Sequence, residues 1–191
     1  MRPLAVVPVR SLQGMSRLSD RLDAASRSDL TKTLTRRTLE ACREAGCDAA
    51  VVTADTDVGR WATDQRVAIL VDPGHGLNTA AETAVGAAQG RLWLVVHGDL
   101  PLLAGSDISA VVAACGPLPV LAPSHDGGTS VIAATTDSFP FRYGPGSFRR
   151  HLAAVAGWAS VVSRPGLAFD LDRSRDLDTA RLLGGESGER H

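Results

Sequence analysis

Lysine is almost absent from this 191-residue sequence, which contains Lys32 alone. Arginine therefore carries nearly all of the basic charge, and the formal net charge is only -1. A chain with so little net charge has no bulk electrostatic field that would recruit nucleic acid or an anionic membrane. The sequence also has no apolar run of membrane-spanning length and no secretory signal pattern at its N-terminus. We therefore expect a cytoplasmic globular protein that binds small molecules, without nucleic acid or membrane partners.

Cysteine is scarce as well. Cys42, Cys47 and Cys115 form an odd set without paired spacing, which argues against a disulfide framework. No cluster of histidine and further cysteine accompanies Cys42 and Cys47 to complete a zinc site. We interpret all three as small apolar residues of a protein from a reducing compartment.

Three common enzyme signatures are also missing. The first apolar run leads into no Gly-x-Gly-x-x-Gly turn, and the chain has no Walker motif and no Gly-x-Ser-x-Gly elbow. These absences argue against a Rossmann dinucleotide site, a P-loop and Ser-His-Asp catalysis.

The sequence does contain a regular alternation of short apolar runs and amphipathic stretches. This alternation is typical of an α/β protein with a parallel sheet and right-handed crossovers. After Gly116 the rhythm changes, and a short loop separates two runs that form either a hairpin or a bent extended pair. We predict one domain over residues 1–183 and a frayed tail at 184–191. The expected strands are 4–9, 48–53, 67–71, 92–96, 119–123, 129–135 and 158–162, and the expected main helices are 28–45, 77–89, 106–114, 147–156 and 174–183.

The most informative stretch runs from Leu92 to Leu103. Its first half is rich in valine and leucine, which predicts a strand buried on both faces, and Asp99 follows at the carboxyl end of that strand. Ligands bind at this edge in open α/β sheets. Asp99 is therefore a candidate to hold a metal ion against a nucleotide phosphate. The alternative is that Asp99 caps the next helix or completes a turn.

Two further carboxylates could join it. The run 166–172 predicts an extended segment in which Asp170 and Asp172 share one face, although both could equally be turn and cap residues before the last helix. Carboxylates from separate strands suit magnesium, and the loop 10–23 carries three arginines that could neutralise phosphate oxygens. Such a set suits phosphoryl or nucleotidyl transfer, where catalysis is mainly positioning and charge neutralisation.

Two glycine-containing turns are further candidates. Gly127-Gly128-Thr129 and the stretch from Tyr143 to Ser147 could present backbone N–H groups to an anion. Ser147 is predicted to cap a helix, where the helix dipole favours negative charge. Both stretches could instead be ordinary turns, as glycine-rich turns usually are. We interpret His97 as a strand-end residue and His151 as part of a helix face rather than as acid–base groups.

Taken together, these motifs resemble a known family. They are Pro8-Val9-Arg10, Ser16-Arg17-Leu18-Ser19, Leu77-Asn78-Thr79-Ala80, Gly98-Asp99-Leu100-Pro101, Gly127-Gly128-Thr129, Tyr143-Gly144-Pro145-Gly146-Ser147 with His151, and Asp170-Leu171-Asp172. In this order and spacing they resemble the 2-phospho-L-lactate and phosphoenolpyruvate guanylyltransferases of deazaflavin coenzyme F-420 biosynthesis.

The resemblance implies a three-layer α/β/α fold like that of nucleotide-diphospho-sugar transferases, with a mostly parallel sheet and one antiparallel strand. It also implies GTP as co-substrate, Mg²⁺ as cofactor and a small phosphorylated acid as acceptor. The implied site residues are Asp99 and Arg17 for catalysis; Arg10, Arg17, Asn78 and Asp99 for the nucleotide; Gly128, Thr129, Gly144 and Ser147 for the acceptor; and Asp99, Asp170 and Asp172 for the metal.

The chain departs from the family pattern in its lysines. Family members usually carry lysine at the positions of Arg10 and Met15, and only Arg10 keeps the charge. Arginine and lysine are not equivalent at a phosphate. Either Arg17 or Arg21 compensates for Met15, or turnover is slow.

Two other functions fit the sequence less well. A molybdenum-cofactor or sugar-phosphate nucleotidyltransferase of the same fold would open with a glycine-rich loop followed by arginine and lysine, whereas residues 10–19 contain Gly14 alone. The methionine at position 15 suggests instead a nucleotide-binding relative with weak catalysis. Phosphoenolpyruvate, 2-phospho-L-lactate and 3-phosphoglycerate all fit the resemblance as acceptors.

Overall fold

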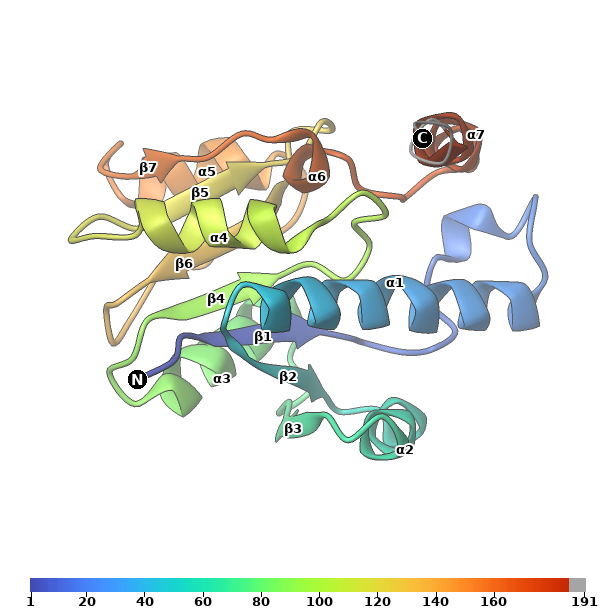
Figure 1. Cartoon of the computed structure of the whole chain (residues 1–191), viewed down its shortest axis with the longest axis horizontal. Helices are drawn as coiled ribbons and strands as arrows, with labels where there is room; N and C mark the ends of the chain where they lie inside the picture. Colours follow the sequence, from blue (N-terminus) through green and yellow to red (C-terminus); the bar gives the residue numbers. More distant parts are fainter. Residues whose placement is uncertain (186–191) are drawn as a thin grey trace.

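A computed structural model describes residues 1–185, in which seven strands form one sheet (Figure 1). Their order across the sheet is β3-β2-β1-β4-β6-β5-β7. Strand β6 runs antiparallel to β4 and β5, and the other neighbouring pairs in this sheet are parallel. The predicted mostly parallel sheet with one antiparallel strand is confirmed. The strands are β1 (Leu4–Pro8), β2 (Asp48–Thr53), β3 (Ala68–Val71), β4 (Trp93–Val96), β5 (Val120–Pro123), β6 (Thr129–Ala134) and β7 (Ser160–Val161).

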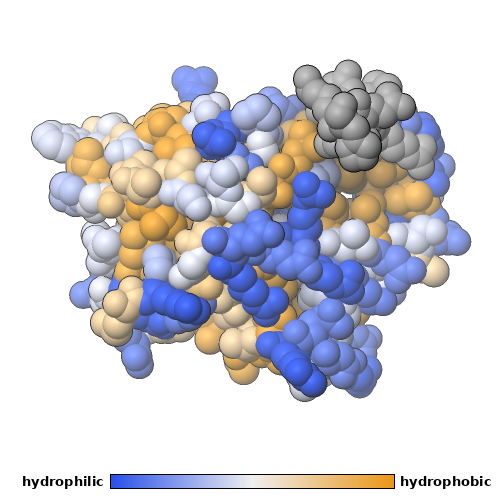
Figure 2. Space-filling model, viewed as in Figure 1, coloured by the Kyte–Doolittle hydropathy of each residue, from blue (hydrophilic) through white to orange (hydrophobic). Residues whose placement is uncertain are grey.

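Helices cover both faces of the sheet and give the predicted three layers. Helices α1 and α4 lie on one face and α3 and α5 on the other (Figure 1). Figure 2 shows mainly hydrophilic side chains over the outer side of α1, as expected for a helix with one buried face. The helices are α1 (Ala24–Glu44), α2 (Thr56–Asp64), α3 (Leu77–Ala88), α4 (Gly105–Ala114), α5 (Ser147–Ala154), α6 (Pro165–Ala168) and α7 (Ser174–Gly185), with a 3-10 turn η1 at Ser16–Leu18.

The central strands are buried on both faces because alternate side chains enter different helical layers. In β4, Val95 packs in the cluster on the α3 side, whereas Leu94 and Val96 pack in the cluster on the α1 and α4 side. The prediction of a strand buried on both faces at 92–96 is therefore confirmed. Cys42 and Cys47 lie in the second cluster as free thiols, and burial raises the pKa of both.

The strand order decides where a ligand can bind. The chain moves from β1 to β2 on one side and later returns to place β4 on the other side of β1, which opens a crevice at the carboxyl ends of these strands. Because β6 runs the opposite way, its first residue, Thr129, lies at the same edge of the sheet. The His97 N–H donates to the Ser130 carbonyl (2.9 Å), joining the end of β4 to the start of β6.

Several local predictions differ from the structure. The run 166–172 is not extended throughout, because Pro165–Ala168 form the short helix α6 with proline at its first turn. Helix α1 begins at Ala24 rather than at 28, since the Asp23 side chain accepts a hydrogen bond from Ser26 N (2.7 Å). Helix α7 ends two residues beyond the predicted 183, and residues 186–191 of the predicted tail lie outside the described residues.

None of the helices in residues 1–185 has the combination of length and apolar composition that a membrane span requires.

The geometry around α6 generates a stability prediction. The buried Asp107 carboxylate accepts hydrogen bonds from Arg164 Nε (2.6 Å) and Ala104 N (3.1 Å). A Cβ atom at Gly166 would collide with Asp107 Oδ2 and lie 2.8 Å from the Leu102 carbonyl. We expect Gly166→Ala to lower the free energy of unfolding by about 1–3 kcal/mol, measured by urea denaturation.

Gly86→Ala is the matched control. Gly86 lies on the exposed side of α3, and nothing stands within 4 Å of its Cβ position. Alanine there should raise stability by about 0.5–1 kcal/mol, because glycine weakens a helix interior. Equal stabilities for the two variants would contradict the packing described at Gly166.

Candidate active site

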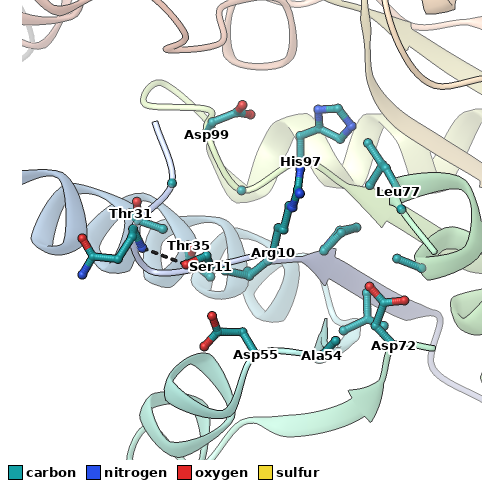
Figure 3. Close-up of a pocket in the computed structure, with 18 of the residues that line it drawn as sticks. Arg10, Ser11, Thr31, Thr35, Ala54, Asp55, Asp72, Leu77, His97 and Asp99 are labelled. Carbon is teal, nitrogen blue, oxygen red and sulfur yellow. Dashed lines mark hydrogen bonds between the residues drawn. The ribbon is translucent and has the colours of Figure 1, made fainter. Parts of the chain in front are cut away.

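A cleft of about 960 Å³ opens at the carboxyl ends of β1, β2, β3 and β4 (Figure 3). It is bounded by the loop after β1, two threonines of α1, the turns after β2 and β3, the start of α3, and the turn after β4. This is the crevice that the strand order predicts. Among its lining residues are Arg10, Gly14, Met15, Asp55, Asp72, Leu77, His97 and Asp99.

The cleft has carboxylates at both ends and a cation between them. Arg10 is the one lysine or arginine among the described residues that line it, and Figure 3 shows its side chain extending toward His97. Asp55 and Asp72 lie on the opposite side, where each shapes the backbone: Asp55 caps α2 and Asp72 accepts from Gly74 N (2.9 Å). The predicted nucleotide residue Arg10 therefore faces the cleft.

Asp99 is held at the other end without a hydrogen-bond donor for one of its oxygens. Its Oδ1 atom is buried and has no partner among the described residues. Burial is the main cause that raises the pKa of Asp99, and the nearby charges of Asp172 and Asp126 raise it further, against a lowering by His97. Close packing of Gly98 sets this position, since a Cβ there would lie 3.2 Å from Val7 Cγ1.

A backbone contact brings the second pair of predicted carboxylates to Asp99. The Leu171 N–H donates to the Asp99 carbonyl (2.9 Å), and the buried Leu171 separates Asp170 from Asp172. Burial raises the pKa of Asp170, and the charges of Asp126 and Asp99 add to the effect. The structure thus gathers Asp99, Asp170 and Asp172 in one neighbourhood.

Asp170 and Asp172 nevertheless have different partners. Asp170 Oδ1 is buried, and His125 Nδ1 stands 2.9 Å from it but outside hydrogen-bonding geometry. Asp172 is half-buried and forms an ion pair with Arg17. Within residues 1–185, no three His, Cys, Asp or Glu side chains are already arranged around a common metal position.

The ion pair of Arg17 belongs to a broader connection between the loop after β1 and the last helix. Arg21 Nη2 lies 3.1 Å from Asp178 Oδ1, and Ser174 donates to Asp20. Leu18, Leu34, Leu171 and Leu177 form an apolar cluster beneath these contacts. Neither Arg17 nor Arg21 lines the cleft in this arrangement.

The predicted acceptor residues Thr129 and Ser147 meet in the interior. Ser147 donates to Thr129 Oγ1 (3.2 Å), and His151 Nδ1 lies 2.9 Å from the same oxygen. The prediction that Ser147 caps α5 is wrong, because Gly146, at φ +65°, occupies the cap position and Ser147 is the first helical residue. The Ser147 hydroxyl is thereby turned toward Thr129 instead of toward the helix end.

Gly144, Gly128 and Asn78 shape the backbone around this pair. Gly144 has φ +119°, a left-handed conformation that suits glycine, and Gly128 N donates to Asp126 Oδ1 (2.8 Å). The Asn78 Oδ1 atom accepts a hydrogen bond from Tyr143 N (2.9 Å), which ties α3 to the turn before α5. Asn78 is absent from the described lining of the cleft.

Sequence reasoning missed two residues of this region, Asp126 and His125. The Asp126 carboxylate accepts hydrogen bonds from Ser124 Oγ (2.6 Å) and from Gly128 N. Burial by itself would raise the pKa of Asp126, but these hydrogen bonds and the charge of His125 hold that pKa below its usual value. His125 stacks on Phe169 with ring centroids 5.4 Å apart. Both residues come directly after β5, at the same edge of the sheet where Asp99 follows β4. This position was the signal that could have identified them as candidates.

Comparison with solved structures shows the same fold in a distant protein. A crystal structure described as a nucleotide-diphospho-sugar transferase from Desulfovibrio desulfuricans G20 superposes with a TM-score of 0.83 at 15% identity, covering 100% of this chain and 91% of that one. At this identity the likeness concerns the fold alone.

Comparison with curated proteins gives much closer relatives. The chain is 37% identical to the phosphoenolpyruvate guanylyltransferase of Rubrobacter xylanophilus, over 97% of this chain and 96% of that protein. It is 35% identical to the phosphoenolpyruvate guanylyltransferase of Rhodococcus erythropolis, over 94% and 90% of the two chains. Residues 3–182 match the family profile described as guanylyl transferase CofC like. The chain therefore belongs to the CofC-like guanylyl transferase family.

Proposed function

We propose that this protein transfers GMP from GTP to the phosphate of phosphoenolpyruvate and releases pyrophosphate, in the route to coenzyme F-420 that the sequence resemblance implies. The nearly full-length relatives named phosphoenolpyruvate guanylyltransferase support this acceptor over 2-phospho-L-lactate. One structural observation carries the proposal. A buried carboxylate oxygen of Asp99 lacks a donor at the end of a nucleotide-sized cleft, beside further carboxylates.

In this proposal the cleft takes GTP. Arg10 contacts the phosphates, and Arg17 and Asp99 complete the nucleotide site. Asn78, which lies outside the described lining of the cleft, supports that site through its bond to Tyr143 N. The position of Arg10 as the cleft's basic side chain within the described residues supports its role. Arg17 lies outside the described lining of the cleft and is paired with Asp172, so in this proposal it contacts a phosphate only after it leaves Asp172.

The carboxylates fit Mg²⁺ as the resident ion. Buried oxygens of Asp99 and Asp170 have no hydrogen-bond donor among the described residues, and like charges surround both. Hard oxygen ligands of this kind suit Mg²⁺, and we propose Asp99, Asp170 and Asp172 as its ligands. Bound there, Mg²⁺ would neutralise phosphate oxygens and the charge that develops on the leaving pyrophosphate.

The chemistry requires positioning rather than a covalent nucleophile. The acceptor phosphate is ionised near neutral pH, so one of its oxygens can attack the α-phosphorus of GTP without a general base. A bond forms from that oxygen to the α-phosphorus, and the bond to the bridging oxygen of pyrophosphate breaks. Because both reactants are anions, the protein's work is to hold them together with arginine and backbone donors. Gly128, Thr129, Gly144 and Ser147 are proposed to hold the acceptor.

Pyrophosphate release tests the activity directly. We expect release when the protein is incubated with GTP, Mg²⁺ and phosphoenolpyruvate, and a guanylylated acid as the second product by mass spectrometry. Reactions with 2-phospho-L-lactate and 3-phosphoglycerate rank the acceptors. No release with any phospho-acid would contradict the proposed function.

Replacement of Asp99 separates its catalytic role from its effect on folding. Asn has nearly the shape of Asp but no charge, so Asp99→Asn should reduce turnover by about 100-fold or more, as expected when a principal electrostatic contact is lost. Without metal, the same variant should be more stable in urea by about 1–3 kcal/mol, because a buried unpaired charge is removed. Mg²⁺ should raise the melting temperature of the wild type and not that of the variant.

Asp137→Asn serves as the control, since Asp137 is exposed in the turn after β6. It should leave turnover, stability and the Mg²⁺ effect unchanged. Near-normal turnover of Asp99→Asn would show that the metal assignment is wrong.

Met15→Lys tests the unusual residue of the cleft. Met15 lines the cleft at φ +54°, in the loop that carries Arg10. A cation there should attract the triphosphate, so we expect the KM for GTP to fall by about threefold to tenfold, which corresponds to roughly 1 kcal/mol. Met15→Gln, with a neutral side chain of similar length, should not change KM. An unchanged KM in Met15→Lys would mean that Arg17 or Arg21 already fills this role.

A further inference from the structure

His151 connects three separate segments at the proposed acceptor site. Its side chain is 0% exposed. Nδ1 lies 2.9 Å from Thr129 Oγ1 at the start of β6, and Nε2 accepts a hydrogen bond from Arg142 N (2.8 Å) in the turn before α5. The ring itself belongs to α5. The interpretation of His151 as part of a helix face therefore omits its contacts with distant residues.

The contact with Arg142 fixes the tautomer of the imidazole. A backbone N–H can only donate, so Nε2 must carry a lone pair. Burial, followed by the charges of Arg150, His97 and Arg142, lowers the pKa of His151 to about 4, so the ring is neutral at pH 7. A neutral ring with a bare Nε2 carries its proton on Nδ1. His151 therefore donates to Thr129 rather than accepting from it.

Aromatic packing prevents the ring from turning over. The Tyr143 ring packs edge-on against it with centroids 4.9 Å apart, and the Phe139 ring lies 5.9 Å away. A flipped ring would present carbon to the Arg142 N–H and leave a buried donor unpaired, which is costly.

The orientation of the His151 ring decides how the two hydroxyl groups can use their protons. Thr129 and Ser147 have two hydroxyl protons, and one of them is used in the bond between the two oxygens. His151 fills an acceptor position of Thr129 with its own proton. The second hydroxyl proton then has no acceptor among the described residues. With the opposite tautomer, Nδ1 would take that proton and the pair would have nothing left to donate.

We propose that His151 is a positioning residue that makes the Thr129–Ser147 hydroxyl pair a net hydrogen-bond donor toward the anionic acceptor. The proposal rests on the proposed function for the identity of that acceptor. Carboxylate and phosphate oxygens are strong acceptors, and a hydrogen bond to an ionised oxygen is about twice as strong as a neutral one. Ser147 directly follows Gly146, and nothing stands within 4 Å of the Cβ position of Gly146, which leaves room for a ligand to approach on that side.

The tautomer can be read directly in the unliganded wild type. Two-bond ¹⁵N–¹H correlation spectra of the imidazole ring at pH 7 should show the proton on Nδ1 and a bare Nε2. A proton on Nε2, or a doubly protonated ring, would overturn the proposal before any activity is measured.

Kinetics then separate positioning from general packing. His151→Phe keeps a planar ring but cannot donate, and it should raise the KM for phosphoenolpyruvate by about tenfold or more. The KM for GTP should change by less than about twofold, because the hydrogen bonds of the ring go to Thr129 and Arg142, which do not line the cleft. His151→Asn, which can place an amide N–H near the Nδ1 position, should lose less acceptor affinity than His151→Phe.

A double-mutant cycle tests the route through Thr129. Thr129→Val removes the hydroxyl, and adding His151→Phe to it should cause no further rise in the KM for phosphoenolpyruvate. Thr136→Val is the control, since the exposed Thr136 hydroxyl only donates to Ser138 O (2.8 Å). Additive effects of the two site variants would mean that His151 acts by packing alone, and would overturn the proposal. If His151→Phe does not fold, the ring spectra of the wild type and titrations of phosphoenolpyruvate into wild type and Thr129→Val decide the proposal.

A failure of the proposed function can be distinguished from a failure of the proposal about His151. If the wild type turns over no phospho-acid, the ring spectra and calorimetric titration of phosphoenolpyruvate into wild type and Thr129→Val still decide the proposal. Binding that is unchanged by Thr129→Val, or undetectable in the wild type, would then count against it.

A pH titration gives an independent readout of the buried ring. The groups that face His151 are Arg150 on α5, Arg142 and Tyr143 from the turn before α5, and His97 after β4. Because the pKa of His151 is depressed in the folded protein, its contribution to stability is complete above pH 6.5 and is lost as the pH falls toward about 4. Wild-type stability should therefore fall more steeply over this window than that of His151→Asn; parallel curves would contradict a neutral ring.

Discussion

The reversal of one strand is the constraint on which the site depends. In an all-parallel sheet, the residues that begin a strand lie at the edge opposite to ligand-binding loops. Because β6 runs antiparallel between β4 and β5, its first residue, Thr129, lies at the edge of the sheet where Asp99 follows β4. The bond from His97 N to Ser130 O fixes this juxtaposition within the backbone. The proposed metal ligand Asp99 and the proposed acceptor residue Thr129 are thereby placed at one edge by topology rather than by loop length.

The same edge collects negative charge that the folded protein does not neutralise by itself. Burial raises the pKa of Asp99 and of Asp170, the charge of Asp126 raises both further, and Asp99 keeps an oxygen without a donor among the described residues. Buried unpaired carboxylates destabilise a fold, so their presence is characteristic of sites that bind a cation or a reacting group. Asp126 differs in kind, because Ser124 and Gly128 satisfy one of its oxygens and make it part of the turn.

The sequence predicted the architecture well and the polar contacts poorly, for physical reasons. Strands such as 92–96 are buried on both faces, so their apolar runs are clear signals. The stretch 166–168 was misread as extended because a short apolar run carries no periodicity, although Pro165 at the first helical turn was an available signal. Ser147 was misread because the left-handed backbone of Gly146, which takes the cap position, is a property of conformation rather than of residue type.

Roles that arise from long-range contacts were beyond local patterns. His151 meets a residue 22 positions away and Asn78 one 65 positions away, and neither contact leaves a trace in the spacing of nearby residues. Asp99 could be predicted as a candidate because it follows the end of a strand, which is a local property. Asp126 likewise follows the end of a strand, β5. Its hydrogen bonds with Ser124 and Gly128 give it a structural role in the turn, so no ligand is needed to explain an aspartate there.

The scarcity of lysine gives the loop after β1 a distinctive set of partners. Arg17 pairs with Asp172 and Arg21 with Asp178, so the loop is fastened to the segment that carries two proposed metal ligands. A guanidinium binds a carboxylate or a phosphate with the same forked geometry. An arriving triphosphate would therefore take Arg17 from this ion pair, and a cation would take the carboxylate of Asp172. This exchange would couple the binding of nucleotide to the binding of metal, because the nucleotide frees Asp172 for the cation and the cation frees Arg17 for the nucleotide.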